Sequence, residues 1–155
     1  MKFPAINFSI FSVLLLSAPA SAQMMGQMMQ GGGMMGMSSV RHQYVMRNGV
    51  DPDYATRTNP LKHTARNIAD GKRLYEQNCA LCHGPTGMGD GEAGKNLSPP
   101  PANIAAFGRT RMATDGYLYW SIAEGGVPFA TGMPPFKASL KQDEIWKIVL
   151  FLREL

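Results

Sequence analysis

Apolar and small residues recur at helical spacing in three segments after residue 64. In the first segment, over about residues 65–78, the inward positions fall three or four residues apart: Ile68, Gly71, Tyr75 and Cys79. Thr64 stands directly before this segment and can cap its N-terminus with its hydroxyl oxygen. The pattern therefore predicts an amphipathic helix.

Two further helices are predicted nearer the C-terminus. Thr114 can cap a helix over about residues 115–124, which the pair Gly125-Gly126 would end. Ser139 and Gln142 fit a capping-box pattern for a last helix over about residues 140–153. The apolar positions of this last helix are Ile145, Trp146, Ile148, Val149, Phe151 and Leu152. No strand alternation stands out, so we expect an all-α domain over residues 65–155.

The connections between these helices are long and rich in glycine and proline. They cover residues 84–114 and 127–138. A structureless connection of that length needs something to organise it, and a domain of about 90 residues buries only a modest core. A bound cofactor would supply both the organisation and the missing apolar mass.

The first 22 residues read as a secretory signal peptide. Lys2 provides the positive charge, an apolar run follows over residues 6–16, and Ala20-Ser21-Ala22 offers the small residues that signal peptidase requires. We expect cleavage before Gln23 and export to the periplasm. An uncleaved anchor is the alternative, but the run is shorter than the roughly 20 apolar residues of a spanning helix. We expect no transmembrane helix in the mature chain.

Residues 23–40 form a tail rich in methionine and glycine, for which we expect disorder. Half of the fourteen residues from Met24 to Met37 are methionine. Because thioethers select Cu(I), copper binding at Met24–Met37 is one hypothesis, and a variable linker is the other. An arm over residues 41–64 follows, with turn signals at Asn48-Gly49, Asp51-Pro52 and Asn59-Pro60.

The net charge of +4 belongs to the N-terminal part of the chain. Residues 67–155 carry nine basic and nine acidic residues, whereas residues 23–66 carry five basic residues against two acidic ones. No clustered basic stripe is present, so nucleic-acid binding is not expected. The basic arm is either a solvated tail or a contact for an acidic partner or lipid surface.

The two cysteines of the chain stand in one short motif, Cys79-Ala80-Leu81-Cys82-His83. This spacing suits thioether attachment of haem to two thiols, with the following histidine as an iron ligand. The alternatives are a disulfide, a thioredoxin-like redox pair without its usual βαβ surroundings, and a zinc site without a second cysteine pair. Export agrees with haem attachment, which takes place outside the cytoplasm.

Residues 65–155 resemble the class I c-type cytochromes. Gly71, Tyr75 and Cys79 match the small–aromatic–cysteine spacing of that family's N-terminal helix, and the loops at residues 87–91 and 97–103 look like those of bacterial members. In the family the glycine lets the C-terminal helix cross closely, so Ile148 and Phe151 would be its partners. The resemblance implies three or more helices wrapped around one covalently bound haem c, and one-electron transfer.

The resemblance also implies a methionine as second axial ligand, and Met133 is the candidate. It follows His83 by 50 residues, between Gly132 and Pro134, which allow close backbone approach and stiffen the loop. Ordinary core filling is the alternative role. The rival ligands are Met88, Met112, His42 and His63. With both axial positions filled, electron transfer is favoured over oxygen or peroxide chemistry.

We also predict which residues contact the haem and its histidine ligand. The second ring N–H of His83 should donate to a backbone carbonyl, and we predict Pro100 of the Pro99-Pro100-Pro101 run as the acceptor. Four side chains are candidate donors to the haem propionates: Arg109, Arg111, Tyr117 and Trp120. Trp120 and Pro100 are the predicted cofactor contacts.

We therefore expect a periplasmic monohaem electron carrier, not an enzyme, that exchanges electrons with redox partner proteins. Its contact surface would surround Ala80, Leu81 and the Met133 loop. Two alternatives are a copper-handling haem protein that uses the methionine-rich tail, and a haem subunit of an oxidoreductase complex. The sequence names neither the donor nor the acceptor.

Overall fold

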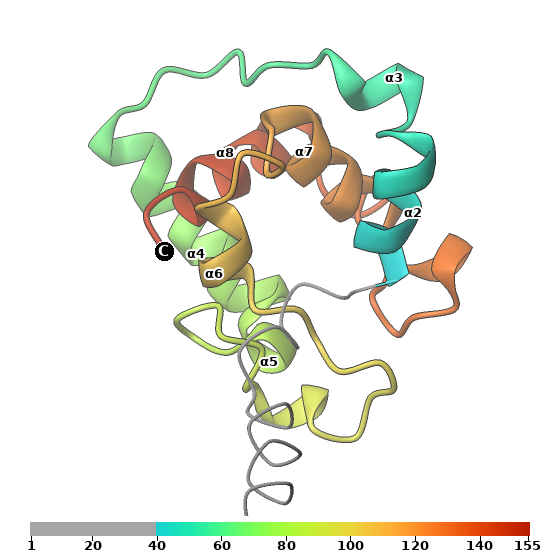
Figure 1. Ribbon diagram of the computed structural model, residues 1–155. Helices are drawn as coiled ribbons and strands as arrows, with labels where there is room; N and C mark the ends of the chain where they lie inside the picture. Colours follow the sequence, from blue (N-terminus) through green and yellow to red (C-terminus); the bar gives the residue numbers. More distant parts are fainter. Residues whose placement is uncertain (1–39) are drawn as a thin grey trace, which may run out of the picture. The chain divides into compact units, whose positions relative to one another are not determined.

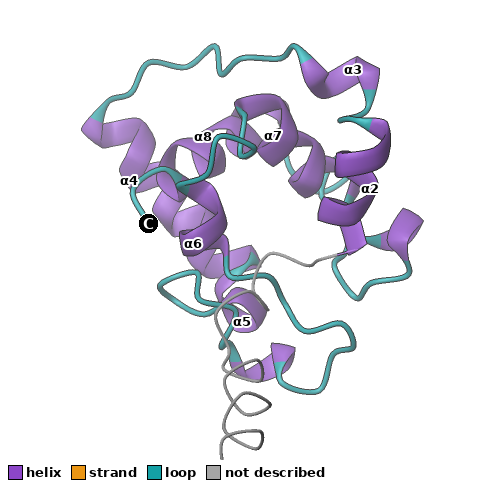
Figure 2. Ribbon diagram, in the orientation of Figure 1, coloured by secondary structure: helices purple, strands orange, loops and turns teal. Residues whose placement is uncertain are grey.

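The computed structural model describes residues 40–155 of the chain. These residues form helices joined by loops, and no strand occurs among them (Figure 2). The all-α prediction is therefore confirmed. The predicted signal peptide, residues 1–22, and the proposed copper segment, Met24–Met37, lie outside the described residues.

The helices follow one another along the chain as Figure 1 labels them. The α-helices are α2 (Val40–Asn48), α3 (Pro52–Ala55), α4 (Ala65–Asn78), α5 (Ala80–His83), α6 (Ile104–Gly108), α7 (Asp115–Glu124) and α8 (Gln142–Leu152). Two 3₁₀ turns, η1 (Glu92–Gly94) and η2 (Val127–Phe129), lie in the long connections.

Helices α4 and α7 begin and end where the sequence predicts. The hydroxyl oxygen of Thr64 accepts the N–H of Asn67 at 3.2 Å, and that of Thr114 accepts the N–H of Tyr117 at 3.1 Å. Each bond satisfies one of the free amides of a helical first turn. Gly125 then ends α7 with φ of +61°, a conformation that side chains disfavour.

The start of α8 is a correction. The helix begins at Gln142, with Lys141 as its N-cap, and not at residue 140 with a cap at Ser139. The N–H of Lys141 donates to the carboxylate of Glu144 at 2.8 Å, whereas the Ser139 hydroxyl donates to the carbonyl of Phe136. A charged acceptor makes the stronger hydrogen bond, so Glu144 sets the first turn.

The N-terminal arm contains helices where the sequence indicated only turns, because α2 covers its start and α3 follows. The predicted turn at Asp51-Pro52 is the start of α3, where an Asp51 carboxylate oxygen accepts the N–H of Asp53 at 2.9 Å. Long-range contacts hold the arm to the helical domain. The Tyr54 hydroxyl donates to Glu124, and the Asn59 side-chain amide donates to the carbonyl of Trp146 at 2.8 Å.

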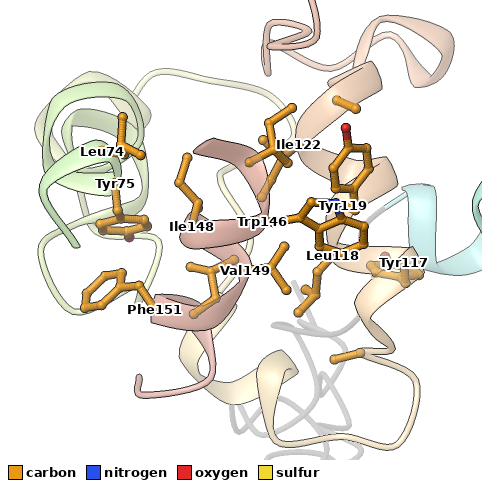
Figure 3. Packing of buried hydrophobic residues seen from close by; sticks show 14 residues of the cluster. Leu74, Tyr75, Tyr117, Leu118, Tyr119, Ile122, Trp146, Ile148, Val149 and Phe151 are labelled. Carbon is orange, nitrogen blue, oxygen red and sulfur yellow. The ribbon is translucent and has the colours of Figure 1, made fainter. Parts of the chain in front are cut away.

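Helix α8 lies at the centre of the hydrophobic core, between α4 and α7 (Figure 3). On one side the ring of Phe151 packs against Tyr75 of α4, with centroids 5.2 Å apart. On the other side Trp146 packs against Tyr119 of α7, with centroids 4.3 Å apart. Within residues 40–155, no helix is long and apolar enough to cross a membrane.

The crossing of α4 and α8 requires a glycine. A Cβ built on Gly71 would lie 2.0 Å from the carbonyl oxygen of Lys147 and 3.1 Å from the Cβ of Phe151. The predicted close crossing is thus confirmed, with Phe151 as one partner. The atoms nearest to this Cβ belong to the backbone of Lys147. Ile148, the other expected partner, is fully buried in the same core.

Gly71→Ala should destabilise the protein, because a backbone carbonyl cannot swing aside as a side chain can. We expect the free energy of unfolding to fall by about 1–3 kcal/mol, measured by chemical denaturation. Gly108→Ala is the control, because its Cβ would meet its nearest atom at an ordinary 3.4 Å. An equal loss in both variants would contradict the role assigned to the crossing.

Docking of the arm should weaken in acid. Hydrogen bonds from Lys137, at 2.7 Å, and from Tyr54 lower the pKa of Glu124. A carboxyl group whose pKa is depressed by folding stabilises the protein above its unfolded pKa, and this stability is lost as the pH falls through the folded value. Glu124→Gln should therefore cost about 1 kcal/mol at pH 7 and progressively less below about pH 4.5.

Urea denaturation at pH 7 and pH 3 would measure this difference. Glu92→Gln is the control, because its carboxylate pairs only with its near neighbour Lys95 and is 80% exposed. A cost for Glu124→Gln that is the same at both pH values would show that the carboxylate charge does not hold the arm.

Candidate functional site

The Cys79–His83 motif is folded into one helical turn. Cys79 ends α4, with its N–H donating to the carbonyl of Tyr75 at 2.8 Å, and α5 starts at the next residue. The N–H groups of Cys82 and His83 both donate to the carbonyl of Cys79, at 3.1 and 2.9 Å. Because the turn continues a core helix, both cysteines and the histidine are held on a rigid support.

The loop after the motif packs on this turn through its glycines. A Cβ on Gly91 would lie 2.5 Å from the carbonyl oxygen of Leu81, and one on Gly94 would lie 2.6 Å from that of Cys82. The same Cβ on Gly94 would lie 2.5 Å from the ring of Pro101, so this ring also packs closely on the glycine. The backbone at Gly91 and Gly94 therefore lies directly on the backbone of the motif, and this close packing holds the proline run against the motif.

The imidazole of His83 is oriented by a backbone carbonyl. Its Nδ1 lies 3.1 Å from the carbonyl oxygen of Ala102. A carbonyl can only accept, so Nδ1 carries the proton and Nε2 keeps its lone pair. Burial lowers the pKa of His83, and the Ala102 hydrogen bond opposes this only partly. The ring is therefore neutral, which is the form that binds metals.

The prediction of Pro100 as this acceptor is wrong. The N–H groups of Ile104 and Ala105 both donate to the carbonyl of Gly87, which ties the downstream end of the proline run to the loop beyond His83. Ala102 is thereby brought under the imidazole. Pro100 does line the adjoining cavity, so its contact with a cofactor stays a prediction.

The thiols do not have the character of a redox pair. Burial, and secondarily the neighbouring Cys82, raises the pKa of Cys79 to about 12. A dithiol that reacts by nucleophilic exchange needs a lowered pKa, so this environment disfavours the thioredoxin-like alternative. No disulfide joins the two cysteines. Among residues 40–155, no group of three or more His, Cys, Asp or Glu side chains could hold a metal ion.

The motif opens onto a cavity walled mostly by apolar side chains. Its empty volume, counted to the open mouth, is about 1250 Å³. A concave site with mostly apolar walls and a few polar groups is typical of a site for an organic cofactor. The motif contributes Cys79, Cys82 and His83 to the cavity wall. Other residues in the wall include Val40, Arg41, Pro100, Tyr117, Phe129 and Met133.

Met133 lines this cavity from the loop between α7 and α8. The N–H of Gly126 donates to the carbonyl of Met133 at 2.8 Å, which holds the loop closed. A Cβ on Gly132 would lie 3.0 Å from the side chain of Leu97, so the glycine does permit a close approach. Met133 thus stands in the same cavity as His83.

The rival ligands stand elsewhere, and none of them lines the cavity. Met88 is 58% exposed, and Met112 is partly buried away from the cavity. His63 pairs with Glu154 at 2.8 Å. His42 presents its ring edge-on to Phe107, with centroids 6.1 Å apart.

Of the four predicted propionate donors, only Tyr117 lines the cavity, and this side chain is buried. Arg109 and Arg111 are exposed, and Arg109 donates to the carbonyl of Leu155. Trp120 is buried but does not line the cavity. Its ring instead lies 4.4 Å from the guanidinium carbon of Arg41.

Sequence reasoning missed Arg41, which the structure places in the cavity wall with Val40. The residue stands in the polar arm, where a single arginine among other charged and amide side chains gives no local signal of burial. Only its contacts with distant segments, at Trp120, Gly125 and Phe129, identify it.

These residues fit a covalently held haem. Two half-buried cysteines at the attachment spacing, a neutral histidine with a fixed tautomer and a methionine thioether share one cavity with mostly apolar walls. The cavity also holds a cationic guanidinium, which suits the carboxylate-bearing edge of such a group.

Comparison with known proteins agrees with this arrangement. The sequence model of the family described as cytochrome c oxidase, cbb3-type, subunit III, matches residues 66–152, which is more than half of the chain. The chain belongs to this cytochrome c family. The cytochrome c domain therefore includes α4 to α8, while α2 and α3 precede the matched region. Membership implies covalent haem c and haem-based electron transfer.

A solved structure gives a further likeness. This chain resembles a chain of the Kuenenia stuttgartiensis reducing HAO-like protein complex, with 28% sequence identity and a TM-score of 0.52. The match covers 61% of this chain and 46% of that one, so this chain spans about half the length of that relative. No curated protein matches.

Proposed function

We propose that the chain is an exported monohaem cytochrome that carries single electrons between redox partner proteins in the periplasm. The observation that supports this best is the shared cavity, in which His83 and Met133 are the two side chains suited to bind one iron from the attachment turn and from the α7–α8 loop. When bound, haem supplies a one-electron iron couple.

Each residue of the cavity has a separate part in this proposal. Cys79 and Cys82 hold the haem through thioether bonds, and His83 ligates the iron through Nε2 because Ala102 occupies Nδ1. Met133 ligates with its sulfur, which favours reduced iron and raises the potential relative to a second histidine. The apolar walls exclude water, and so both oxidation states keep one set of contacts.

Partner contact would occur next to the attachment turn. Leu81, between the two cysteines, is 68% exposed, and Val127, in the loop that carries Met133, is 65% exposed. A contiguous patch of exposed apolar side chains marks a protein contact site, and we propose that these two residues belong to one. Neither Leu81 nor Val127 has a charge that would select one partner.

A haem subunit of a larger oxidoreductase complex is the second candidate. The family description names an oxidase subunit, and the solved relative belongs to a protein complex. Size-exclusion chromatography of the protein purified gently from its natural host distinguishes the two. A free carrier elutes at the mass of the single chain, whereas a subunit elutes with its partners.

Purified protein should show one reversible one-electron transition in an optical redox titration, with the spectrum of a c-type haem. Its mass should exceed that of the polypeptide by one haem. The reduced protein should bind carbon monoxide only slowly, because both axial positions are filled. Protein with polypeptide mass alone would end the proposal, and rapid carbon monoxide binding would favour an enzyme with an open iron site.

Met133→Ala tests the second ligand. Loss of the thioether should lower the midpoint potential by on the order of 0.1 V, within the roughly 0.8 V that axial ligands span. The absorption band of the sulfur–iron bond should disappear, and added imidazole should bind. Met88→Ala is the matched control, because that side chain is exposed and outside the cavity. A sulfur–iron band that survives in Met133→Ala would refute the assignment.

A further inference from the structure

Among the charged residues in the described part of the chain, Arg41 is the one that is buried, with 8% of its surface exposed. It lies in the first turn of α2, before the region that matches the cytochrome family. Its guanidinium carbon lies 4.4 Å from the ring centre of Trp120 and 4.7 Å from that of Phe129. The two rings therefore flank the cation and keep water from it.

The hydrogen bonds of this guanidinium are incomplete. Nη2 donates to the carbonyl of Gly125, whereas Nη1 is buried without a hydrogen-bond partner among the described residues. Arginine keeps its proton at any physiological pH, so the charge cannot be avoided by titration. A buried cation with an unused donor is costly unless an anion completes it.

The protein does not itself supply that anion at Nη1. The carboxylate of Glu124 acts on Arg41 only as a nearby charge, and its oxygens accept from Lys137 and from Tyr54. The phenol of Tyr117, whose pKa is raised by burial, is neutral. The remaining direction is the cavity itself, which Arg41 lines together with His83 and Met133.

We propose that Nη1 of Arg41 binds a propionate carboxylate of the haem, so that the N-terminal arm supplies a cofactor-binding residue to the cytochrome c domain. The inference rests on the proposed haem in this cavity. Haem bears its two carboxylates on one edge, and a guanidinium donates to a carboxylate in a charge-assisted hydrogen bond. The haem would in turn satisfy the donor that the polypeptide leaves unpaired.

This contact would tune the iron as well as hold the haem. A cation near the iron, in surroundings of low dielectric constant, opposes the extra positive charge of the oxidised state. It also neutralises a carboxylate that would otherwise favour oxidation. Arg41 therefore raises the midpoint potential, and loss of its charge lowers it.

Three variants of the haem-loaded, full-length protein test the proposal. Arg41→Gln removes the charge, Arg41→Lys keeps it, and Arg47→Gln makes the same charge change at an exposed position of the same helix. The measurements are the midpoint potential and the propionate bending vibrations in resonance Raman spectra. A purely structural role of Arg41 would alter unfolding without moving the propionate vibrations.

We expect Arg41→Gln to lower the potential more than Arg47→Gln does, to shift the propionate vibrations, and to be largely rescued in potential by Arg41→Lys. A potential equal to that of Arg47→Gln, with unshifted vibrations, would overturn the proposal. If Arg41→Gln yields no folded protein, the vibrations of Arg41→Lys decide alone: a shift supports the contact and no shift overturns it. Wild-type protein without haem would instead refute the proposed function.

Discussion

At Gly71, helix α4 approaches α8 so closely that any Cβ would collide with the carbonyl oxygen of Lys147. This contact fixes how α4 lies on α8, and Tyr75, one turn after Gly71, packs on Phe151 of α8. The same tyrosine donates through its hydroxyl group to the carbonyl of Gly84 at 2.7 Å. The attachment turn, between Tyr75 and Gly84, is thereby fixed relative to the core.

The sequence predicted those parts of the fold that depend on neighbouring residues. The bounds of α4 and α7 follow from the hydroxyl groups of Thr64 and Thr114 and from Gly125, all of which act within one turn of their helix. The start of α8 was missed because two polar groups compete there, and the carboxylate of Glu144 prevails over Ser139. Helix α2 was missed because its stability comes from residues that lie far along the chain.

The candidate site, too, was predictable where it depends on neighbouring residues and not where it depends on distant ones. The spacing of Cys79, Cys82 and His83 is a local property, and the flanks of Met133 marked it before the structure showed that it lines the same cavity. Which carbonyl lies next to His83 depends on how the connection after His83 folds back to Gly87, and three consecutive prolines carry no signal that would select Ala102. Arg41 lines the cavity and packs on Trp120, which does not line it, and no local pattern in the sequence indicates this arrangement.

The attachment of the arm also has a consequence for the order of events during synthesis. The acceptors that hold residues 41–63 over a long range lie between residues 115 and 154: Asp115, Glu124, Gly125, Trp146 and Glu154. The ribosome therefore makes the arm first and its anchoring points last. Throughout that interval Cys79 and Cys82 already exist while Arg41 lacks its distant contacts, so Arg41 cannot take its place in the cavity wall before the chain is nearly complete.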